Sequence, residues 1–519
     1  MNAIYQQFVG SLHQLPYNLS QHMLISVVSL VLGIVISLLL AILATRRVSL
    51  RWPLLTSASI MQTVPSIALL ALVYALLLGL STLIAQSGAI GRIQGISFIT
   101  AIVALTLYSI LPVMRNTVTG ILGVDPALIE AARGMGMTPG QILRRVQLPL
   151  AAPVIIAGIR TATVWVVGIA TLSTPVGQTS LGDFIFTGLQ LQNWGAVLLG
   201  CVAAAVLAIV LDALIAALQS AAEKRSVARG IVAGLGLMLV VGGGLAPLVI
   251  PKPDHLVGAK TFDEQFILAS LIRDRLNEAG FSAAKQEGLG STIAFTKLRY
   301  NQIDCYVDYS GTIWAVQMGR TDVADADTVL AEVTRWLKAE HGIECLGKLG
   351  FENAYCLAMK RSQAQELGIR TIADLAAHAS ELSIGGDYEF FDRPEWKAIR
   401  NAYHLQFTQQ RKFQSTLMYQ AVHRGEVDVI SAFSSDGRIA AMDLLVLEDP
   451  HQAIPPYDAI LLVSPKAATA PGFLDALKPL LGSINDDTMR RANYQVDRGD
   501  DKRTPDQAAR WIEEQIAGH

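Results

Sequence analysis

The sequence predicts two bodies in one chain: an α-helical transmembrane domain over residues 1–250 and an α/β domain over residues 251–519. The first half carries only 12 Lys/Arg and 5 Asp/Glu, whereas the second carries 29 and 38, so their net charges are +7 and −9. Long uncharged apolar stretches occur only in the first half, and short apolar runs alternate with helical patterns in the second. Such asymmetry indicates a membrane domain joined to a water-exposed domain. No basic cluster is dense enough to indicate a nucleic-acid partner.

About six membrane helices are expected in the first half, because a helix needs roughly 20 apolar residues to cross a bilayer. The second stretch is long enough for a span and an outer connection, and Pro65 and Gly79 interrupt it. The qualifying stretches are 23–45, 56–91, 93–114, about 150–172, 196–220 and 230–250.

Basic residues in the connecting loops predict the orientation of these helices. Cytoplasmic loops are enriched in Lys and Arg, which places the N-terminus and everything after residue 250 outside the cytoplasm. No cleavable signal peptide is visible, so the first helix is expected to be an uncleaved anchor. The loops after the first, third and fifth helices hold Arg46, Arg47, Arg51, Arg115, Arg133, Arg144, Arg145, Lys224, Arg225 and Arg229, whereas the alternate loops hold only Arg92.

Two charged residues, Arg160 and Asp212, lie within the apolar stretches. Charges inside a membrane are costly and often functional. Both residues lie towards the cytoplasmic ends of their helices, however. Snorkelling to the interface or a helix–helix pair is therefore favoured over a role in substrate binding.

Residues 130–149, EAARGMGMTPGQILRRVQLP, follow the third predicted helix. Small Ala and Gly residues allow close approach to a partner, and Glu130 stands where a carboxylate suits a helix N-terminus. The spacing resembles the EAA loop of bacterial ABC importer permeases, in which a cytoplasmic helix pair docks onto the ATP-hydrolysing subunit; Val146 in place of Ile is the departure. The matching positions are Glu130, Ala131, Ala132, Gly136, Leu148 and Pro149. The alternative is an ordinary amphipathic connector.

This resemblance implies a multi-pass protein of the bacterial cytoplasmic (inner) membrane that works with a cytoplasmic ABC ATPase subunit. The chain has no G-x-x-x-x-G-K-[ST] phosphate loop, so ATP hydrolysis is expected on a separate chain and none here. One such loop per chain implies a homodimer, since two ATPase subunits must each be docked.

In the second half, β-like apolar runs alternate with helical patterns, which predicts an α/β architecture with ligand sites at strand ends. A helix is expected over 263–279 and another from 312. The runs are 256–260, 303–309, 356–360, 382–386, 427–433, 444–449 and 459–464.

Ordered blocks along residues 255–519 resemble the soluble binding proteins of osmoprotectant ABC importers, which bind glycine betaine, choline, carnitine or related compounds. The blocks are GAKTFDEQFIL, LGSTIAFTKL, IDCYVDYSGT, NAYCLA, YEFFDRPEW, VISAFSSDGRI, VLEDP, PPYDA and NYQVD. The resemblance implies a two-lobed, hinged receptor of the periplasmic-binding-protein type. Lobe one is expected over about 255–353 and 459–519, and lobe two over about 354–458.

A quaternary ammonium has no N–H to donate and is held by cation–π attraction to aromatic faces. Where the family has four cage tyrosines, this sequence has Tyr309, Tyr355, Phe433 and Tyr457. Phe433 keeps the ring and lacks the hydroxyl, which admits a related zwitterion such as ergothioneine or another trimethylammonium compound. For a ligand carboxylate, the matching donors are Lys260, Thr312 and Arg393, and Asn353 stands where some relatives have an acid.

The remaining features are less specific. Cys345 and Cys356 are the one cysteine pair considered for a disulfide, with unpaired buried thiols as the alternative. The nine histidines show no metal pattern, and no cofactor is expected. The sequence therefore predicts an importer subunit that supplies both pore and receptor. The alternatives are a membrane-anchored ligand sensor, which the EAA-like segment disfavours, and an extracellular enzyme, for which no catalytic set is visible.

Overall fold

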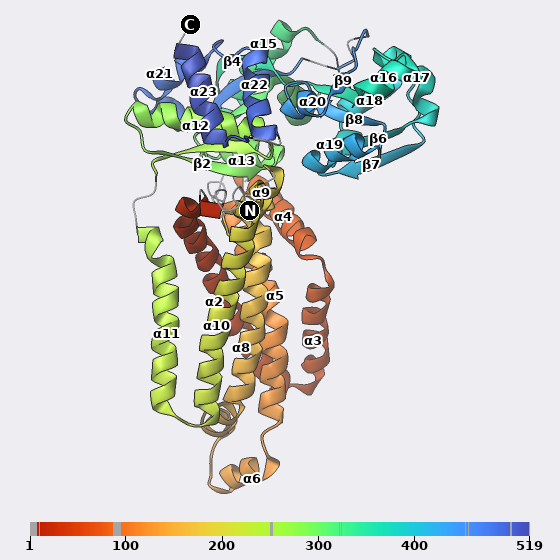
Figure 1. Ribbon diagram of the computed structural model, residues 1–519. Coiled ribbons are helices and arrows are strands. Elements are labelled where there is room, and N and C mark those ends of the chain that lie inside the picture. The colour runs from red at the N-terminus through yellow and green to blue at the C-terminus, as the bar shows by residue number, and fades with distance from the viewer. Residues whose placement is uncertain are drawn as a thin grey trace. The chain divides into compact units, whose positions relative to one another are not determined.

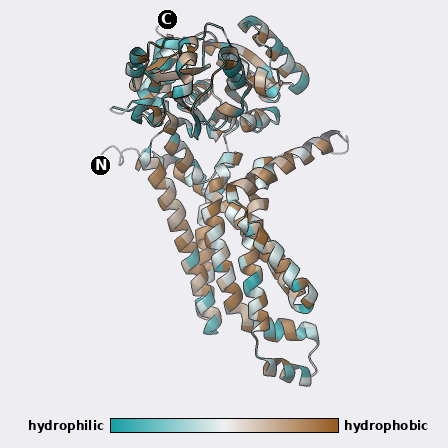
Figure 2. Cartoon of the chain, turned by 90° about the vertical axis from the view of Figure 1, so that its right-hand side faces the viewer, coloured by the Kyte–Doolittle hydropathy of each residue, from teal (hydrophilic) through white to brown (hydrophobic). Residues whose placement is uncertain are grey.

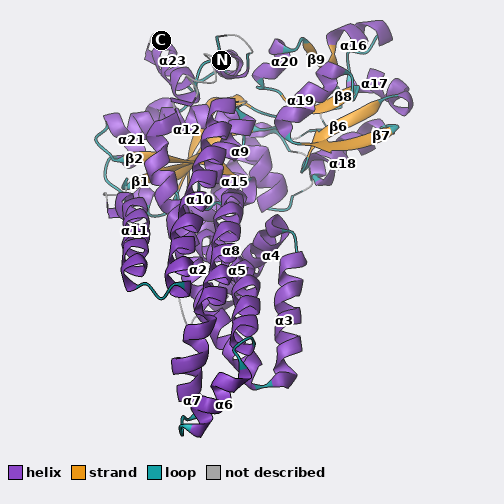
Figure 3. Cartoon of the chain, turned by 60° about the horizontal axis from the view of Figure 1, so that its bottom comes forward, coloured by secondary structure: helices purple, strands orange, loops and turns teal. Residues whose placement is uncertain are grey.

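The computed structural model describes residues 8–9, 11–86, 95–191, 193–249, 253–320, 322, 324–451, 453–454, 456–498 and 501–517. The chain forms two compact units (Figure 1), one of Met1–Gly188 with Asn193–Lys252 and the other of Leu189–Gln192 with Pro253–His519. All strands of the described part lie in the second unit, as the orange segments of Figure 3 show. The predicted fold class, a helical permease-like domain followed by a sheet-and-helix domain, is confirmed.

The first unit is built from long apolar helices, which are mostly brown in Figure 2. Within its described residues, five helices are long and apolar enough to cross a membrane, or six if the bent pair α3 and α4 is one span. The helices are α2 (Leu15–Arg46), α3 (Val48–Thr63), α4 (Ser66–Gln86), α5 (Ile96–Leu122), α6 (Pro126–Gly134), α7 (Pro139–Ile142), α8 (Leu148–Ala170), α9 (Gly182–Gln190), α10 (Trp194–Glu223) and α11 (Val227–Leu245).

The predicted break at Pro65 separates α3 from α4, whose axes are bent by 103°. Val64 takes φ −70° and ψ 129°, the extended backbone that a following proline imposes. The second expected interruption was wrong, because Gly79 lies inside α4. The predicted helix limits near 91 and 93, and the domain boundary near 251, fall outside the described residues.

Close packing of α2, α5 and α8 depends on small residues. A Cβ on Gly158 of α8 would lie 2.8 Å from the carbonyl oxygen of Pro112 in α5. The two charged residues noted in the sequence form a helix–helix pair: Arg160 of α8 donates from Nε and Nη2 to both oxygens of Asp212 in α10, at 3.0 and 2.9 Å. Arg160 also donates to the side-chain oxygen of Gln219.

The segment between α8 and α9 packs tightly against the preceding helices. The amide of Leu181 donates to Nδ1 of His22, whose Nε2 lies 3.1 Å from the carbonyl oxygen of Val167. A Cβ on Gly182 would lie 1.8 Å from the carbonyl oxygen of Thr171. Position 182 therefore accepts only glycine without movement of the main chain.

The second unit contains two five-stranded mixed sheets, which define its two lobes. The first-lobe sheet has the order β2-β1-β3-β10-β4, and the second-lobe sheet has the order β7-β6-β8-β5-β9. Their strands are β1 (His255–Lys260), β2 (Ala283–Leu289), β3 (Cys305–Tyr309), β4 (Glu344–Glu352), β5 (Tyr355–Lys360), β6 (Ser383–Asp387), β7 (Gln409–Phe413), β8 (Val429–Phe433), β9 (Leu444–Val446) and β10 (Asp458–Val463). The chain crosses between the sheets after β4 and returns before β10.

Helices cover these sheets. The helix expected over 263–279 is α12 (Asp263–Glu278), whereas the one expected from 312 is the short α14 (Ser310–Thr312) continued by the π-turn Ile313–Gln317. The others are α13 (Ser291–Arg299), α15 (Ala326–His341), α16 (Arg361–Leu367), α17 (Ile372–His378), α18 (Pro394–Tyr403), α19 (Ser415–Arg424), α20 (Gly437–Ala441), α21 (Phe473–Leu477), α22 (Asp486–Asp497) and α23 (Pro505–Ala517).

The cysteines are free in the structure. Cys345 lies on β4 of the first sheet and Cys356 on β5 of the second, so the disulfide considered from the sequence is not formed. Burial raises the pKa of the Cys356 thiol to about 12, which keeps it protonated and unreactive.

Candidate functional site

A continuous row of aromatic rings crosses between the two lobes. Tyr309, at the end of β3, stacks on Phe262 with ring centroids 6.2 Å apart, and Phe262 stacks on Phe433 at 5.9 Å with an interplanar angle of 6°. Phe433 in turn lies 4.8 Å from Tyr355, and Tyr355 lies 6.3 Å from Tyr457. The structure thus brings together the four aromatic residues singled out in the sequence.

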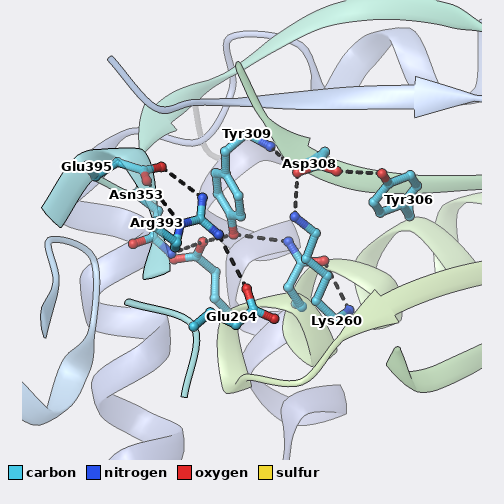
Figure 4. A network of polar contacts seen from close by, with 10 residues as sticks. Lys260, Glu264, Tyr306, Asp308, Tyr309, Asn353, Arg393 and Glu395 are labelled. Atoms are coloured by element: carbon cyan, nitrogen blue, oxygen red, sulfur yellow. Dashed lines mark hydrogen bonds and ion pairs between the residues drawn. The ribbon is translucent and has the colours of Figure 1, made fainter. Parts of the chain in front are cut away.

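A buried carboxylate, Glu264, lies beside this row in the first turn of α12 and is 3% exposed. Its Oε1 accepts hydrogen bonds from the Tyr309 hydroxyl at 2.5 Å and from Nδ2 of Asn353 at 3.0 Å (Figure 4). Its Oε2 accepts from the Ser435 hydroxyl and from Nδ2 of Asn493. Burial raises the pKa of Glu264, and the four hydrogen bonds act in the opposite direction. These partners come from both lobes and from the crossing segment between β4 and β5.

The basic residues predicted to hold a ligand carboxylate are already paired with carboxylates of the protein. Lys260, at the end of β1, is hydrogen-bonded to the buried Asp308 (Figure 4). Arg393 donates from Nε and Nη2 to both oxygens of Glu395, at 3.2 and 2.9 Å. Their charges also face the rings: the Lys260 nitrogen is 5.2 Å from the Tyr309 centroid, and the Arg393 guanidinium carbon is 5.0 Å from that of Tyr355.

The third predicted donor, Thr312, is 5% exposed and ends the short helix that follows Tyr309. Tyr457 also contacts the Arg393 pair, because its hydroxyl is hydrogen-bonded to Glu395. A ligand carboxylate would therefore have to compete with Glu395 for Arg393. Lys260 and Arg393 are thus neutralised by acids of the protein, whereas the buried Glu264 is hydrogen-bonded to uncharged side chains.

A small cavity lies between the lobes beside Phe262 and Phe433 of this row. Its volume is about 10 Å³, close to the space of one water molecule. Four of its side chains are carboxylic acids and one is a guanidinium, an acidic environment that suits a cation. Its lining residues are Phe262, Asp263, Glu264, Asn353, Phe433, Ser435, Asp436, Arg438, Asn493 and Asp497.

The lobes also meet at Arg438, which begins α20 together with Gly437. Arg438 donates from Nε and Nη2 to both oxygens of Asp436, and its Nε lies 3.8 Å from Asp497 of α22. Burial, followed by the charge of Asp263, raises the pKa of Asp497 well above its usual value. A Cβ on Gly437 would lie 2.3 Å from the backbone nitrogen of Tyr494 in α22. The two lobes are therefore in main-chain contact here.

Sequence reasoning missed Phe262, Glu264, Ser435 and Asn493 as members of the site. All four lie inside blocks that the sequence analysis quoted, and Phe262 and Glu264 lie two and four positions after Lys260. Glu264 looks like an ordinary residue of a helix first turn, where carboxylates are common. Only the fold shows that it is buried against residues up to 229 positions away.

The EAA-like segment forms two short helices in the first unit. The side chain of Asp125 caps α6 by accepting from the Ala127 amide, and Thr138 forms a capping box with Gln141 at the start of α7. Glu130 therefore does not lie in the first turn of α6, contrary to expectation, because Asp125 and Pro126 begin that helix. Gly136 takes φ +77°, which permits the tight turn between the helices.

The other coupling candidates lie on the same two helices and at the start of α8. Ala132 is buried, whereas Glu130, Ala131, Gly136 and Pro149 are exposed and Leu148 is half-buried. Leu128 and Met135 add large exposed apolar side chains, 47% and 71% exposed. A short helical hairpin with exposed apolar residues is a suitable docking element for another protein.

Two family models match successive parts of the chain. Residues 256–514 match the substrate-binding domain of ABC-type glycine betaine transport systems, and residues 29–226 match the inner-membrane component of binding-protein-dependent transport systems. The fold and these matches define a transporter subunit with a permease and a receptor.

A relative that combines permease and binding protein is found among curated proteins, and other relatives match one part of the chain. The ergothioneine transport permease/ergothioneine-binding protein of Helicobacter pylori (strain G27) is 28% identical over 486 residues, covering 90% of this chain and 84% of that one. The choline transport system permease of Bacillus subtilis (strain 168) is 40% identical over 203 residues, covering 39% of this chain and 86% of that one. A crystal structure of a glycine betaine/carnitine/choline ABC transporter is 25% identical, with a TM-score of 0.45, and covers 51% of this chain and 99% of that one.

The chain belongs to the osmoprotectant-type ABC importers and carries the permease and the substrate-binding domain in one polypeptide. Its permease unit places it in the inner membrane as a multi-pass protein.

Proposed function

We propose that this chain imports a quaternary-ammonium compound, such as glycine betaine, choline, carnitine or ergothioneine, and supplies both the pore and the receptor. The observation that carries the proposal is the continuous row Tyr309, Phe262, Phe433, Tyr355 and Tyr457 beside the buried Glu264.

Aromatic faces and a buried acid suit a cation that cannot donate a hydrogen bond. Each well-placed ring contributes about 0.5–2 kcal/mol to such a cation, more when the site is dry. The carboxylate of Glu264 supplies a longer-range attraction in a site of low dielectric. The named substrates of the relatives have this chemistry: choline and ergothioneine carry a trimethylammonium group.

The receptor is proposed to close on its ligand as a hinged pair of lobes, 255–353 with 459–519 and 354–458. Two features support this: each lobe has its own sheet, and the chain crosses between the sheets at two places. The site residues Lys260, Thr312 and Tyr309 belong to one lobe, and Tyr355, Arg393 and Phe433 belong to the other. Lobe closure would therefore complete the site.

ATP hydrolysis is proposed to occur on a separate cytoplasmic ATPase that docks onto Glu130, Ala131, Ala132, Gly136, Leu148 and Pro149. The exposed hairpin of α6 and α7 supports this role. The active assembly would hold two copies of this chain, one for each ATPase subunit. The N-terminus and residues after about 250 would lie outside the cytoplasm, as the distribution of Lys and Arg indicates.

The substrate class can be tested by calorimetric titration of the full chain in lipid nanodiscs with glycine betaine, choline, carnitine and ergothioneine. The matched control ligand is 3,3-dimethyl-1-butanol, which has the shape of choline without its charge. We expect saturable binding of at least one cation and binding of the neutral analogue at least about tenfold weaker, as loss of about 1.4 kcal/mol requires. Equal binding of choline and its neutral analogue, or no binding of any cation, would overturn the proposal.

The coupling role needs a separate experiment. Glu130→Arg, compared with the control Glu223→Arg on α10, is expected to abolish ATP-driven uptake in proteoliposomes while leaving ligand binding unchanged. Uptake at the wild-type rate by the Glu130→Arg variant would show that this segment does not couple the two subunits.

A further inference from the structure

The orientations of two buried asparagine side chains are determined by their partners. Nδ2 of Asn493 donates to Oε2 of Glu264 at 3.0 Å and to the carbonyl oxygen of Ser435 at 2.7 Å. A carbonyl oxygen can only accept, so the amide nitrogen must face Ser435. Nδ2 of Asn353 donates to the other oxygen of Glu264 at 3.0 Å. Glu264, which accepts four hydrogen bonds, therefore orients both amides with their nitrogens towards itself.

This orientation leaves the side-chain oxygens of both asparagines without a donor. Oδ1 of Asn353 and Oδ1 of Asn493 are buried and have no hydrogen-bond partner among the described residues. The two side chains are 4% and 2% exposed. A buried polar atom without a partner costs about 1–3 kcal/mol, so two of them in one place call for a donor that the protein itself does not provide.

Both asparagines line the small cavity between the lobes, together with the aromatic faces of Phe262 and Phe433. Arg438 in the lining is already paired with Asp436. The other polar side chains of the lining present more hydrogen-bond acceptor atoms than unpaired donor groups. The lining comes from both lobes, so the cavity would enlarge when the lobes separate. An occupant of this cavity would meet rings on one side and acceptor oxygens on the other.

We propose that the ligand is a quaternary-ammonium compound whose other end presents N–H or O–H donors to Asn353 and Asn493. This inference rests on the proposed function and narrows its substrate class. Glu264 acts as a positioning residue, because it holds the two amides with their oxygens free. Glycine betaine has no donor and would leave the two oxygens unpaired. Arg393 and Lys260 are paired with protein carboxylates, so recognition does not depend on a ligand carboxylate.

The proposal is tested by comparing ligands that differ in donors on the wild-type chain in nanodiscs. Choline and O-methylcholine have the same cation and differ only in the hydroxyl hydrogen, and ergothioneine adds ring N–H groups that glycine betaine lacks. We expect ergothioneine to bind at least about tenfold more tightly than glycine betaine, and choline more tightly than O-methylcholine, since a lost hydrogen bond at a buried partner corresponds to about tenfold in affinity.

The residue assignment is tested with Asn493→Leu, which keeps the size of the side chain and removes its acceptor together with the N–H donors that bind Glu264 and Ser435. The control is Asn401→Leu, at an exposed position of α18. The quantity compared is the ratio of the ergothioneine affinity to the glycine betaine affinity, which cancels any effect common to both ligands. This ratio should fall about tenfold in Asn493→Leu and stay unchanged in the control.

The outcomes separate this inference from the proposed function. If no quaternary-ammonium ligand binds, the proposed function itself fails. If glycine betaine binds as tightly as ergothioneine, or O-methylcholine as tightly as choline, the receptor is a quaternary-ammonium receptor and the two asparagine oxygens are satisfied by water. That result would overturn the inference even if Asn493→Leu did not fold.

Discussion

Tyr355 and Phe433 are direct cross-strand partners in the antiparallel pair β5–β8, and their ring centroids lie 4.8 Å apart. Cross-strand partners project from the same face of a sheet, so strand register alone brings these rings together. Phe433 also stacks on Phe262 of the first lobe. Phe433 therefore connects the second-lobe sheet to the rest of the aromatic row.

Replacement of Phe433 by Ala is expected to weaken quaternary-ammonium binding by about tenfold or more. The variant loses one cation–π partner and the stacking contact with Phe262 and Tyr355, together on the order of 1.5–3 kcal/mol. Phe433→Tyr keeps the ring and should bind within about threefold of the wild type. Calorimetric titration of the full chain in nanodiscs measures both.

The matched control is Phe281→Leu, in an aromatic cluster of the first lobe formed with His255 and Phe473. It removes a ring at a distance from the row and should leave affinity unchanged. Equal losses of affinity at 281 and 433 would indicate a general loss of structure rather than a cation site.

The pair Arg160–Asp212 is expected to fasten α8 to α10. Either Arg160→Ala or Asp212→Ala should lower the stability of the permease unit, because each leaves a charge without its bidentate partner. The exchange of the two residues, Arg160→Asp with Asp212→Arg, should restore part of the loss. A double-mutant cycle measured by SDS titration should give a coupling energy of about 1 kcal/mol, and additive effects would contradict a direct pair.

Gly182→Ala is expected to destabilise the permease unit by about 3 kcal/mol or prevent its folding. Its Cβ would lie 1.8 Å from the carbonyl oxygen of Thr171, and main-chain atoms cannot yield as a flexible side chain can. Gly168→Ala is the control, since nothing lies within 4 Å of its Cβ. Fluorescence-detected size-exclusion chromatography after stepwise heating should separate the two variants, and identical profiles would contradict the close approach.

Asp506 predicts a pH dependence for the docking of α23 onto α12. Burial opposes its ionisation, but the charges of Lys285 and Arg273 and a hydrogen bond from Ser270 lower the pKa of Asp506. A carboxyl with a lowered pKa in the folded state stabilises it above the unfolded pKa of about 3.9, and the contribution is lost as the pH falls below that value.

Asp506→Asn should therefore lower the melting temperature of the second unit at pH 7 and pH 5, with a smaller difference from wild type at pH 3.5. Scanning calorimetry of the full chain in nanodiscs at these pH values tests the sign. Asp475→Asn is the control, because Asp475 is 75% exposed and its ion pair with Lys478 contributes little. A difference that grows towards low pH would contradict the assignment.

Most of the fold could be predicted because apolar runs mark the buried elements. Every central strand was expected, and the ends of the expected strands lie within three residues of those found. The three strands that were not expected, β2, β4 and β7, are all at sheet edges. Edge strands carry charged and polar side chains and lack a continuous apolar run, as in Gln409–Phe413, so periodicity does not reveal them.

The site could be predicted only where chemistry is visible in a single residue. Aromatic rings at Tyr309, Tyr355, Phe433 and Tyr457 pointed to a cation, and the structure brings them together. Glu264 can be recognised as a site residue only from its burial and from its hydrogen-bond donors. These donors are distant in the sequence, so no local pattern reveals them. The pairing of Arg393 with Glu395 could not be predicted either, although the two residues are only two positions apart. Arg393 is the N-cap residue of α18, and the direction of its side chain depends on how that helix begins.

Gly437 limits how far the receptor can shut. Its α-carbon packs on the main chain at Tyr494, so the arrangement of the lobes in this structure leaves no room for even one methyl group at this point. Gly437→Ala would add one methyl group that keeps the lobes slightly apart without contacting the ligand. A transporter with this substitution would bind substrate and release it on the side from which it came. The rate of uptake would therefore fall before the binding affinity did.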